Sequence, residues 1–135
     1  MQIDYRDQPA ALTPEQFIAL ATKIWAREYD VAATRDALAR TMNISAWDGD
    51  RLVGTVRILT DGYFFSTVPE IMVDPDYRRQ GIGAELMRRA LAVTPGGVLF
   101  FGAQPGQESF FERAGFRRGL TGFVGRAPVK TLSTS

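Results

Sequence analysis

A short basic segment, Arg78-Arg79-Gln80-Gly81-Ile82-Gly83, carries residue types suited to holding an anion. Its arginines supply positive charge, and its glycines leave backbone N–H groups uncovered. Apolar residues recur at helical spacing from Ile82 onward, and a helix N-terminus adds unpaired N–H groups and a partial positive charge. The segment therefore predicts a phosphate site, best matched by a diphosphate that spans several donors. The alternative is that the glycines only permit tight strand-to-helix packing and the arginines are solvated.

Two other glycine-rich phosphate sites do not fit this segment. A dinucleotide-binding fingerprint needs a third glycine where Leu86 stands, and an acidic residue about 20 positions on, where Ala103 falls. A P-loop ends in Gly-Lys-Ser/Thr, and that ending is missing here. The segment thus predicts a phosphate site of another kind.

The composition limits the chemistry available to the chain. Its 135 residues fit one domain, and the absence of Cys and His excludes disulfides, thiolate or imidazole metal sites and cysteine or Ser-His nucleophiles. The net charge of +1 gives no general attraction to nucleic acid or membranes. With no signal-like N-terminus and no long apolar run, a soluble cytoplasmic protein is expected. Carboxylates, hydroxyls, amides and backbone groups remain for chemistry.

The N-terminal half predicts two helices followed by a hairpin. Thr13-Pro14-Glu15-Gln16 is typical of a helix start with a capping box. Trp25 and Tyr29, near the end of that helix, are candidates for lining a pocket. A weaker helix is predicted over residues 32–42, with Met42 inward. Asp48-Gly49-Asp50 then predicts a hairpin between strands over residues 43–47 and 52–60. The inward face of the first helix is predicted to comprise Phe17, Leu20, Ala21, Ile24 and Trp25.

A third strand is predicted over residues 63–73, with Pro69 in its middle. Proline cannot donate to a sheet ladder, so a bulge or break is expected at Val68-Pro69. Beyond it, alternation places Glu70 and Met72 on one face and Ile71 and Val73 on the other.

The remaining elements follow from periodicity and turn residues. After the helix that begins beyond Gly81, the apolar run of residues 98–103 predicts a strand buried on both faces and parallel to the third strand. A short helix over 107–114, capped by Gly115, precedes a closing hairpin that pairs 116–118 with 123–126. Residues 127–135 are expected to form a loose tail.

Two motifs in this order resemble the GCN5-related N-acetyltransferase (GNAT) superfamily. One is Arg78-x-x-Gly81-x-Gly83 after Ile71-Met72-Val73-Asp74-Pro75, and the other is Phe110-Phe111-Glu112-Arg113-Ala114-Gly115-Phe116. The resemblance covers residues 52–116. It implies an α/β fold with a mixed, splayed central sheet flanked by helices on both faces, formed by residues 1–126 as a single domain. Acyl-CoA would lie between the strand ending at Val73 and the one ending near Ala103.

The resemblance also implies which residues bind acetyl-CoA, the expected co-substrate, with no metal involved. The backbone N–H groups of the basic turn would hold the pyrophosphate, and the backbone of Ile71, Met72 and Val73 would pair with the pantetheine arm and the acetyl carbonyl. The full set of expected cofactor-binding residues is Ile71, Met72, Val73, Arg78, Arg79, Gln80, Gly81, Ile82, Gly83, Ala84, Gln104, Ser109 and Phe111.

For catalysis, Glu70 is the candidate base, since it lies beside the predicted bulge and near the expected acetyl group. The alternative is that Glu70 is an ordinary exposed strand residue. Phe111 stands where many members of the superfamily have a tyrosine that protonates the leaving thiolate. Phe111 leaves three alternatives: another group or water supplies the proton, the thiolate leaves without one, or the chain has lost catalysis.

The sequence therefore predicts an acetyl-CoA-dependent N-acetyltransferase that acts on a primary amine by direct attack in a ternary complex. The alternative is an acyl-CoA-binding module without transferase activity. The expected partner is a small-molecule amine with apolar parts, with no nucleic acid and no membrane. A monomer and a homodimer are both compatible with the sequence.

Overall fold

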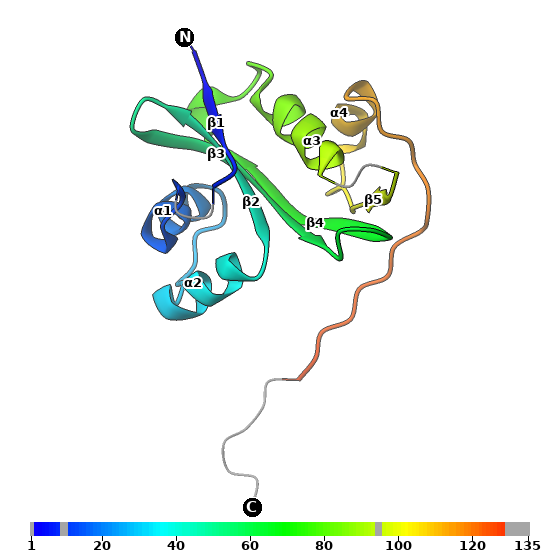
Figure 1. The fold of residues 1–135 in the computed structure, drawn as a ribbon, viewed down its shortest axis with the longest axis horizontal. Coiled ribbons are helices and arrows are strands. Elements are labelled where there is room, and N and C mark those ends of the chain that lie inside the picture. The colour runs from blue at the N-terminus through cyan, green and yellow to red at the C-terminus, as the bar shows by residue number, and fades with distance from the viewer. Residues whose placement is uncertain (1, 9–10, 94–95, 129–135) are drawn as a thin grey trace, which may run out of the picture.

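The computed structural model describes residues 2–8, 11–93 and 96–128 of the chain. One sheet holds five strands in the order β1-β2-β3-β4-β5, with α1 and α2 on one face and α3 on the other (Figure 1). The predicted α/β fold with helices on both faces is confirmed. The strands are β1 (Asp4–Arg6), β2 (Met42–Asp48), β3 (Arg51–Thr60), β4 (Phe65–Val73) and β5 (Val98–Phe100). The helices are α1 (Pro14–Ile24), α2 (Val31–Ala39), the 3₁₀ helix η2 (Pro75–Tyr77), α3 (Ile82–Ala92) and α4 (Glu108–Arg113).

Helix α1 begins at the capping box that its sequence predicts. The Gln16 N–H donates to Thr13 Oγ1 at 3.1 Å, and the Thr13 N–H donates to Gln16 Oε1 at 3.0 Å. Two orphan donors of the first turn are therefore satisfied. Leu20 and Ala21 are buried against the sheet in a cluster that includes Met72 of β4. This packing fixes α1 over the face of β4 that carries Glu70 and Met72.

Helix α3 lies unusually close to the opposite face of the sheet. Its stripe of Ile82, Leu86, Met87 and Ala90 is buried in the main hydrophobic core. A Cβ on Gly54 of β3 would lie 3.2 Å from Ile82 Cγ2 and from Leu86 Cδ1. Glycine at this position therefore lets α3 pack directly on the centre of β3.

Strand β4 carries the irregularity that its proline predicts. Glu70 pairs with Arg57 and Thr67 with Leu59 of the antiparallel neighbour, so Val68 and Pro69 oppose a single residue of β3. This is a β-bulge at the expected place. Beyond it, the side chains divide as the alternation predicts: Met72 packs under α1, whereas Ile71 and Val73 pack with the α3 side of the core.

The sheet splays between β4 and β5. The two strands are parallel, as predicted, but only residues 65–67 of β4 pair with β5. Within the part of the chain that the structure describes, no strand pairs with residues 68–73 along that edge of β4. The second half of β4 therefore presents an open backbone edge, which confirms the splayed sheet.

Several predicted boundaries are wrong for identifiable reasons. Helix α2 ends at Ala39, and Met42 opens β2 with 41% of its surface exposed, because it pairs with Ile58 in the sheet. Strand β1 was not predicted, since three residues carry too little pattern to stand out. Strand β5 stops at Phe100, and Val98 is 57% exposed, so this apolar run is not buried on both faces.

The predicted closing hairpin does not form. Residues 117–128 run as an extended chain without strand pairing, as the orange segment of Figure 1 shows. Phe116 still packs against the core, whereas Phe123 and Val124 are each 93% exposed. With two glycines at positions 119 and 122 and no buried face, nothing fixes a register for this segment. Of the predicted tail, residues 129–135 lie outside the described residues.

Candidate active site

The turn between β4 and α3 presents a row of unpaired backbone N–H groups. Gly81 caps α3 in the left-handed conformation with a φ of 82°, and no side chain caps this helix. Arg79 also has a positive φ, 66°, which is uncommon for a residue with a side chain. No hydrogen bond recorded for the described residues uses the N–H groups of residues 79–84. A Cβ on Gly81 would meet nothing within 4 Å, so the space in front of these donors is open.

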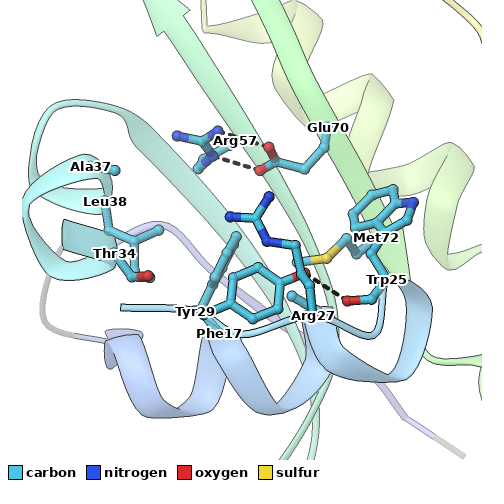
Figure 2. A pocket seen from close by; sticks show the side chains of 11 residues that line it. Phe17, Trp25, Arg27, Tyr29, Thr34, Ala37, Leu38, Arg57, Glu70 and Met72 are labelled. Atoms are coloured by element: carbon cyan, nitrogen blue, oxygen red, sulfur yellow. Dashed lines mark hydrogen bonds and ion pairs between the residues drawn. The ribbon is translucent and has the colours of Figure 1, made fainter. Parts of the chain in front are cut away.

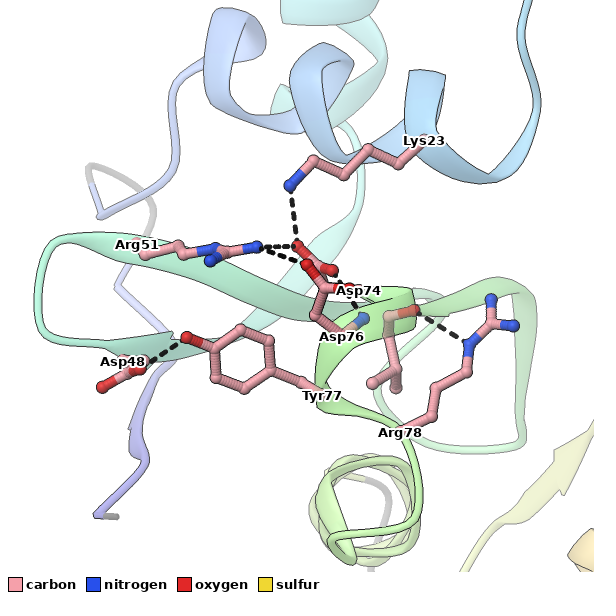
Figure 3. A network of polar contacts seen from close by, with 8 residues as sticks. Lys23, Asp48, Arg51, Asp74, Asp76, Tyr77 and Arg78 are labelled. Atoms are coloured by element: carbon pink, nitrogen blue, oxygen red, sulfur yellow. Dashed lines mark hydrogen bonds and ion pairs between the residues drawn. The ribbon is translucent and has the colours of Figure 1, made fainter.

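The side chains around this turn leave it accessible. Arg78, Arg79 and Gln80 are exposed, and Arg78 Nε donates to the Val73 carbonyl oxygen at 3.3 Å, which places the guanidinium beside the end of β4 (Figure 3). Free N–H groups, open space and two cationic side chains together fit a diphosphate. The turn can therefore hold the pyrophosphate of CoA.

Helix α4 lies against the start of α3. Gly83 is buried, and a Cβ there would lie 3.0 Å from Phe110 Cζ, so glycine permits this contact. Phe111 packs inward, with its ring 4.7 Å from the ring of Phe101 and 5.0 Å from that of Phe110. Val73, the turn and Phe110 thus meet at the start of α3, whereas the Met72 side chain packs under α1 on the other face of the sheet.

Gln104 and Ser109 lie at the α4 side of this region. The Gln104 carbonyl oxygen accepts from the Gln107 N–H at 2.9 Å, which forms the turn before α4. Ser109 is exposed on α4. Among the described residues, no recorded hydrogen bond joins either side chain to the basic turn. Their predicted contact with CoA stays a prediction.

A buried carboxylate, Asp74, anchors the other end of the turn (Figure 3). Its side chain is 1% exposed and accepts hydrogen bonds from Lys23 Nζ at 2.8 Å, Arg51 Nη2 at 3.0 Å and the Asp76 N–H at 2.9 Å. Its own N–H donates to the Val53 carbonyl oxygen at 2.8 Å. Burial alone raises the pKa of the Asp74 carboxyl, but these hydrogen bonds, led by that of Lys23, outweigh burial and lower the pKa to about 2.

On the face of β4 covered by α1 and α2 lies a pocket of about 280 Å³ (Figure 2). Glu70 lines it, next to the bulge, which is where the sequence places the candidate base. Both Glu70 carboxylate oxygens accept hydrogen bonds from Arg57, at 2.6 Å from Nε and 2.8 Å from Nη2. These hydrogen bonds raise the pKa of the Arg57 guanidinium by more than burial lowers it. The lining residues are Phe17, Ala21, Trp25, Arg27, Tyr29, Thr34, Ala37, Leu38, Arg57, Glu70 and Met72.

Some of these lining residues were expected and others were missed. Trp25 and Tyr29 line the pocket, as their place near the helix end suggests. Arg57 was missed, although an arginine at an inward position of an otherwise apolar strand is a signal for a buried ion pair. Arg27 was missed because it lies in the connection between two helices, where a charged residue is unremarkable.

The described residues contain no group of three or more acidic, His or Cys side chains that could hold an ion. In the same residues, no helix has the length and apolar character needed to cross a bilayer.

Comparison with known proteins decides the family. A model of the acetyltransferase (GNAT) domain matches residues 41–118, more than half of the chain. The chain belongs to the GNAT acetyltransferase family. It is 25% identical to a GNAT-family acetyltransferase from Streptococcus pneumoniae TIGR4, with a TM-score of 0.80 covering 93% of this chain and 98% of that one. The family that the two motifs resemble is thereby confirmed.

Two further GNAT-related matches extend the comparison. The chain is 45% identical over 76 residues, 53% of its length, to mycothiol acetyltransferase from Brachybacterium faecium, and this match spans 22% of that protein. AAC(6')-Iy, solved with the bisubstrate analogue CoA-S-monomethyl-acetylneamine, has the same fold, with a TM-score of 0.75 at 14% identity, covering 96% of this chain and 100% of that one. The GNAT family uses acetyl-CoA, so membership supports acetyl transfer from acetyl-CoA as the general activity.

The Asp74 contacts make a specific prediction about acid stability. Because the pKa is about 2 in the folded protein against an ordinary 3.8, ionised Asp74 stabilises the fold fully above pH 3.8, and this contribution disappears as pH falls through about 2. We expect Asp74→Asn to lower the free energy of unfolding at pH 7 by roughly 2 kcal/mol. Urea unfolding at several pH values measures the effect.

Comparing the pH dependence of stability in the wild type and in Asp74→Asn shows whether the Asp74 carboxylate causes the loss of stability in acid. Glu85 has a pKa lowered to about 2 as well, chiefly by its hydrogen bond from Arg88, so the wild type alone cannot assign the acid loss. The gap in stability between wild type and Asp74→Asn is expected to narrow as pH falls from 4 to 2. A gap that stays constant over this range would rule out the ionised Asp74 carboxylate as its source.

Proposed function

We propose that this protein is an N-acetyltransferase that moves an acetyl group from acetyl-CoA to a primary amine by direct attack within a ternary complex. The supporting observation is that β4 serves two sites at once. Its open edge leads to the N–H groups of the basic turn, and its Glu70 side chain lines the pocket on the face under α1 and α2. Donor and acceptor groups would therefore meet along one strand.

On the donor side, the chain's own backbone does most of the binding. The N–H groups of residues 79–84 would hold the pyrophosphate, with Arg79 adding charge. The open edge of β4 at Ile71 and Val73 offers amide groups to an extended, amide-containing arm in the way that a neighbouring strand would. A backbone N–H near Val73 would also stabilise an oxyanion at the reacting carbonyl. Bound acetyl-CoA supplies the activated acetyl group.

On the acceptor side, the chemistry requires a neutral amine. For a lysine-like amine of pKa about 10.4, forming the neutral species at pH 7 costs roughly 4.6 kcal/mol. Glu70 is the proposed base. Each of its oxygens accepts one hydrogen bond from Arg57 and retains a second acceptor site, so Glu70 can still receive a proton directly or through water. Arg57 holds the carboxylate in place beside the bulge.

The leaving-group side lacks an obvious proton donor. Phe111 has no hydroxyl, and its ring is packed against Phe101 and Phe110. A thiol of pKa near 8.5 is a tolerable leaving group without protonation, so transfer does not demand a side-chain acid. The same residue motivates the second candidate function, an acyl-CoA-binding module without transferase activity. Release of CoA thiol in the presence of amines separates the two.

The cofactor proposal predicts that acetyl-CoA stabilises the protein through its diphosphate. Binding at about 1 mM should raise the melting temperature, because a ligand that binds only the folded state stabilises it by mass action. Acetylpantetheine, which lacks the diphosphate, should give a much smaller shift. Arg79→Ala should weaken acetyl-CoA at least tenfold and leave acetylpantetheine unchanged. Differential scanning fluorimetry and calorimetry provide the readouts.

Arg40→Ala is the matched control for this experiment, since Arg40 is exposed at the end of α2, away from the turn. It should bind acetyl-CoA like the wild type. Equal weakening of acetyl-CoA and acetylpantetheine by Arg79→Ala would contradict a phosphate role, and the absence of any stabilisation by acetyl-CoA would overturn the function itself.

The base proposal predicts a pH-dependent loss on replacing Glu70. With a lysine-like amine, Glu70→Gln should lower kcat about 100-fold at pH 7, the range for general-base catalysis, and by less at high pH, where the amine is already neutral. Glu28→Gln, a change of the same type at an exposed position in the α1–α2 connection, should have no effect. If the rate and pH profile of Glu70→Gln match those of the wild type, Glu70 is not the base.

The leaving-group argument predicts that Phe111→Tyr changes little. A tyrosine hydroxyl would supply a proton donor, but the thiolate already leaves without one, so kcat should stay within about threefold of the wild type. Thiol release under saturating amine measures this. An increase of tenfold or more would show that protonation of the thiolate limits the wild-type reaction.

A further inference from the structure

The pocket beside Glu70 is lined by two arginines, of which only one is paired with a carboxylate. Arg57 is neutralised by Glu70 through two short hydrogen bonds, and both side chains are about one-fifth exposed. Arg27 has no acidic partner among the ion pairs of the described residues, and its guanidinium lies 4.7 Å from the centre of the Tyr29 ring. In Figure 2 the Arg27 side chain projects into the pocket. The lining therefore carries one positive charge, on the solvent-exposed Arg27, that no acidic side chain of the described residues neutralises.

Apart from Thr34, whose hydroxyl donates to the Asp30 carbonyl oxygen at 2.7 Å, the rest of the lining is apolar or aromatic. Phe17, Trp25 and Tyr29 contribute rings from α1 and the segment after it, and buried Met72 contributes from β4. The Tyr29 hydroxyl donates to the Trp25 carbonyl oxygen at 2.8 Å, so its hydrogen is already used. A volume of about 280 Å³ is at the small end for ligand sites. The pocket suits one small apolar or aromatic group and not a large polar molecule.

These observations define which amine matches the pocket. An acceptor amine carries a positive ammonium group, which can donate a hydrogen bond to Glu70. The charge of that carboxylate is already neutralised by Arg57. A polycationic amine would be repelled by the uncompensated charge of Arg27. An amine that also carries a carboxylate would place that group on Arg27, where a charge-assisted hydrogen bond is strong. The apolar part would then lie among the rings.

We propose that the acceptor is a small amino acid-like zwitterion, with a primary amine and a carboxylate on an apolar or aromatic skeleton. This inference rests on the proposed function, because it takes the pocket as the acceptor site. In the reaction, the amine nitrogen forms a bond to the acetyl carbon and the carbon–sulfur bond breaks. Of the two protons that the ammonium loses, one ends on the CoA thiol and the other is released to solvent. Arg27 selects the substrate and takes no part in the chemistry.

Matched probes test the inference by binding, without requiring turnover. L-phenylalanine, 2-phenylethylamine and 3-phenylpropanoate differ only in the carboxylate and the amine, and L-leucine with 3-methylbutylamine repeats the comparison on an aliphatic skeleton. Affinities are measured by ligand-observed NMR and calorimetry on the full chain, with and without saturating CoA. At least one amino acid should bind tenfold or more tightly than its decarboxylated partner, and 3-phenylpropanoate should bind more weakly than phenylalanine.

Variants assign the preference to its residue. Arg27→Gln should weaken the preferred amino acid at least tenfold and change its decarboxylated partner less than twofold. Arg40→Gln, the same change at an exposed position on α2 outside the pocket lining, should change neither. Circular dichroism and urea unfolding confirm that each variant is folded.

The outcomes separate this inference from the proposed function. Three outcomes would each overturn the zwitterion inference. Amino acids and decarboxylated amines could bind equally, no amino acid could bind, or Arg27→Gln could weaken the binding of both classes equally. If amines release thiol from acetyl-CoA with no carboxylate preference, the N-acetyltransferase function stands and only the zwitterion inference fails. If acetyl-CoA does not bind at all, the proposed function fails, and the probe affinities measured without CoA still decide what the pocket recognises.

Discussion

The buried carboxylate of Asp74 is the interaction on which the arrangement of both sites depends. It joins α1 through Lys23, β3 through Arg51 and the start of η2 through the Asp76 N–H. These segments meet at the point where β4 leaves the sheet. A buried charge is costly unless it is paired and hydrogen-bonded, and here the pairing comes from elements that would otherwise be free to move apart. Together with the packing of Leu20 and Ala21 on Met72, this group sets the position of the basic turn relative to α1.

Strand β4 has a separate role on each of its two faces and along one edge, and each role has its own physical requirement. One face of β4 packs under α1 and α2 and carries Glu70, which pairs with Arg57 of β3. The other face packs with α3, which Gly54 of β3 allows to approach closely. Among the described residues, no strand pairs with the edge beyond residue 67. The bulge at Val68 and Pro69 makes this combination feasible, because it lets the strand change direction while the face alternation continues correctly to Val73.

Much of this could be predicted from the sequence, because the relevant residues act locally. Thr13 with Gln16, Pro69 in a strand, and Gly81 before an apolar stripe each specify their own conformation. The residues that were missed act across the sheet. Arg57 is informative only once the register with Glu70 is known, and Lys23 meets Asp74 across a separation of 51 positions. The closing hairpin failed for the opposite reason: its turn glycines are present locally, but no partner surface holds the two predicted strands.

The open edge of β4 also bears on how the protein avoids sticking to other chains. Unpaired strand edges invite addition of a foreign strand, and long flat ones do so most. Here the two outer strands of the sheet, β1 and β5, have only three residues each, so the outside offers little to pair with. The unpaired stretch at residues 68–73 lies on an inner strand, with β5 beside its beginning and α3 and α4 meeting near its end. The neighbouring elements at both ends leave little room for a foreign strand, so the geometry that leaves this edge open also limits strand addition.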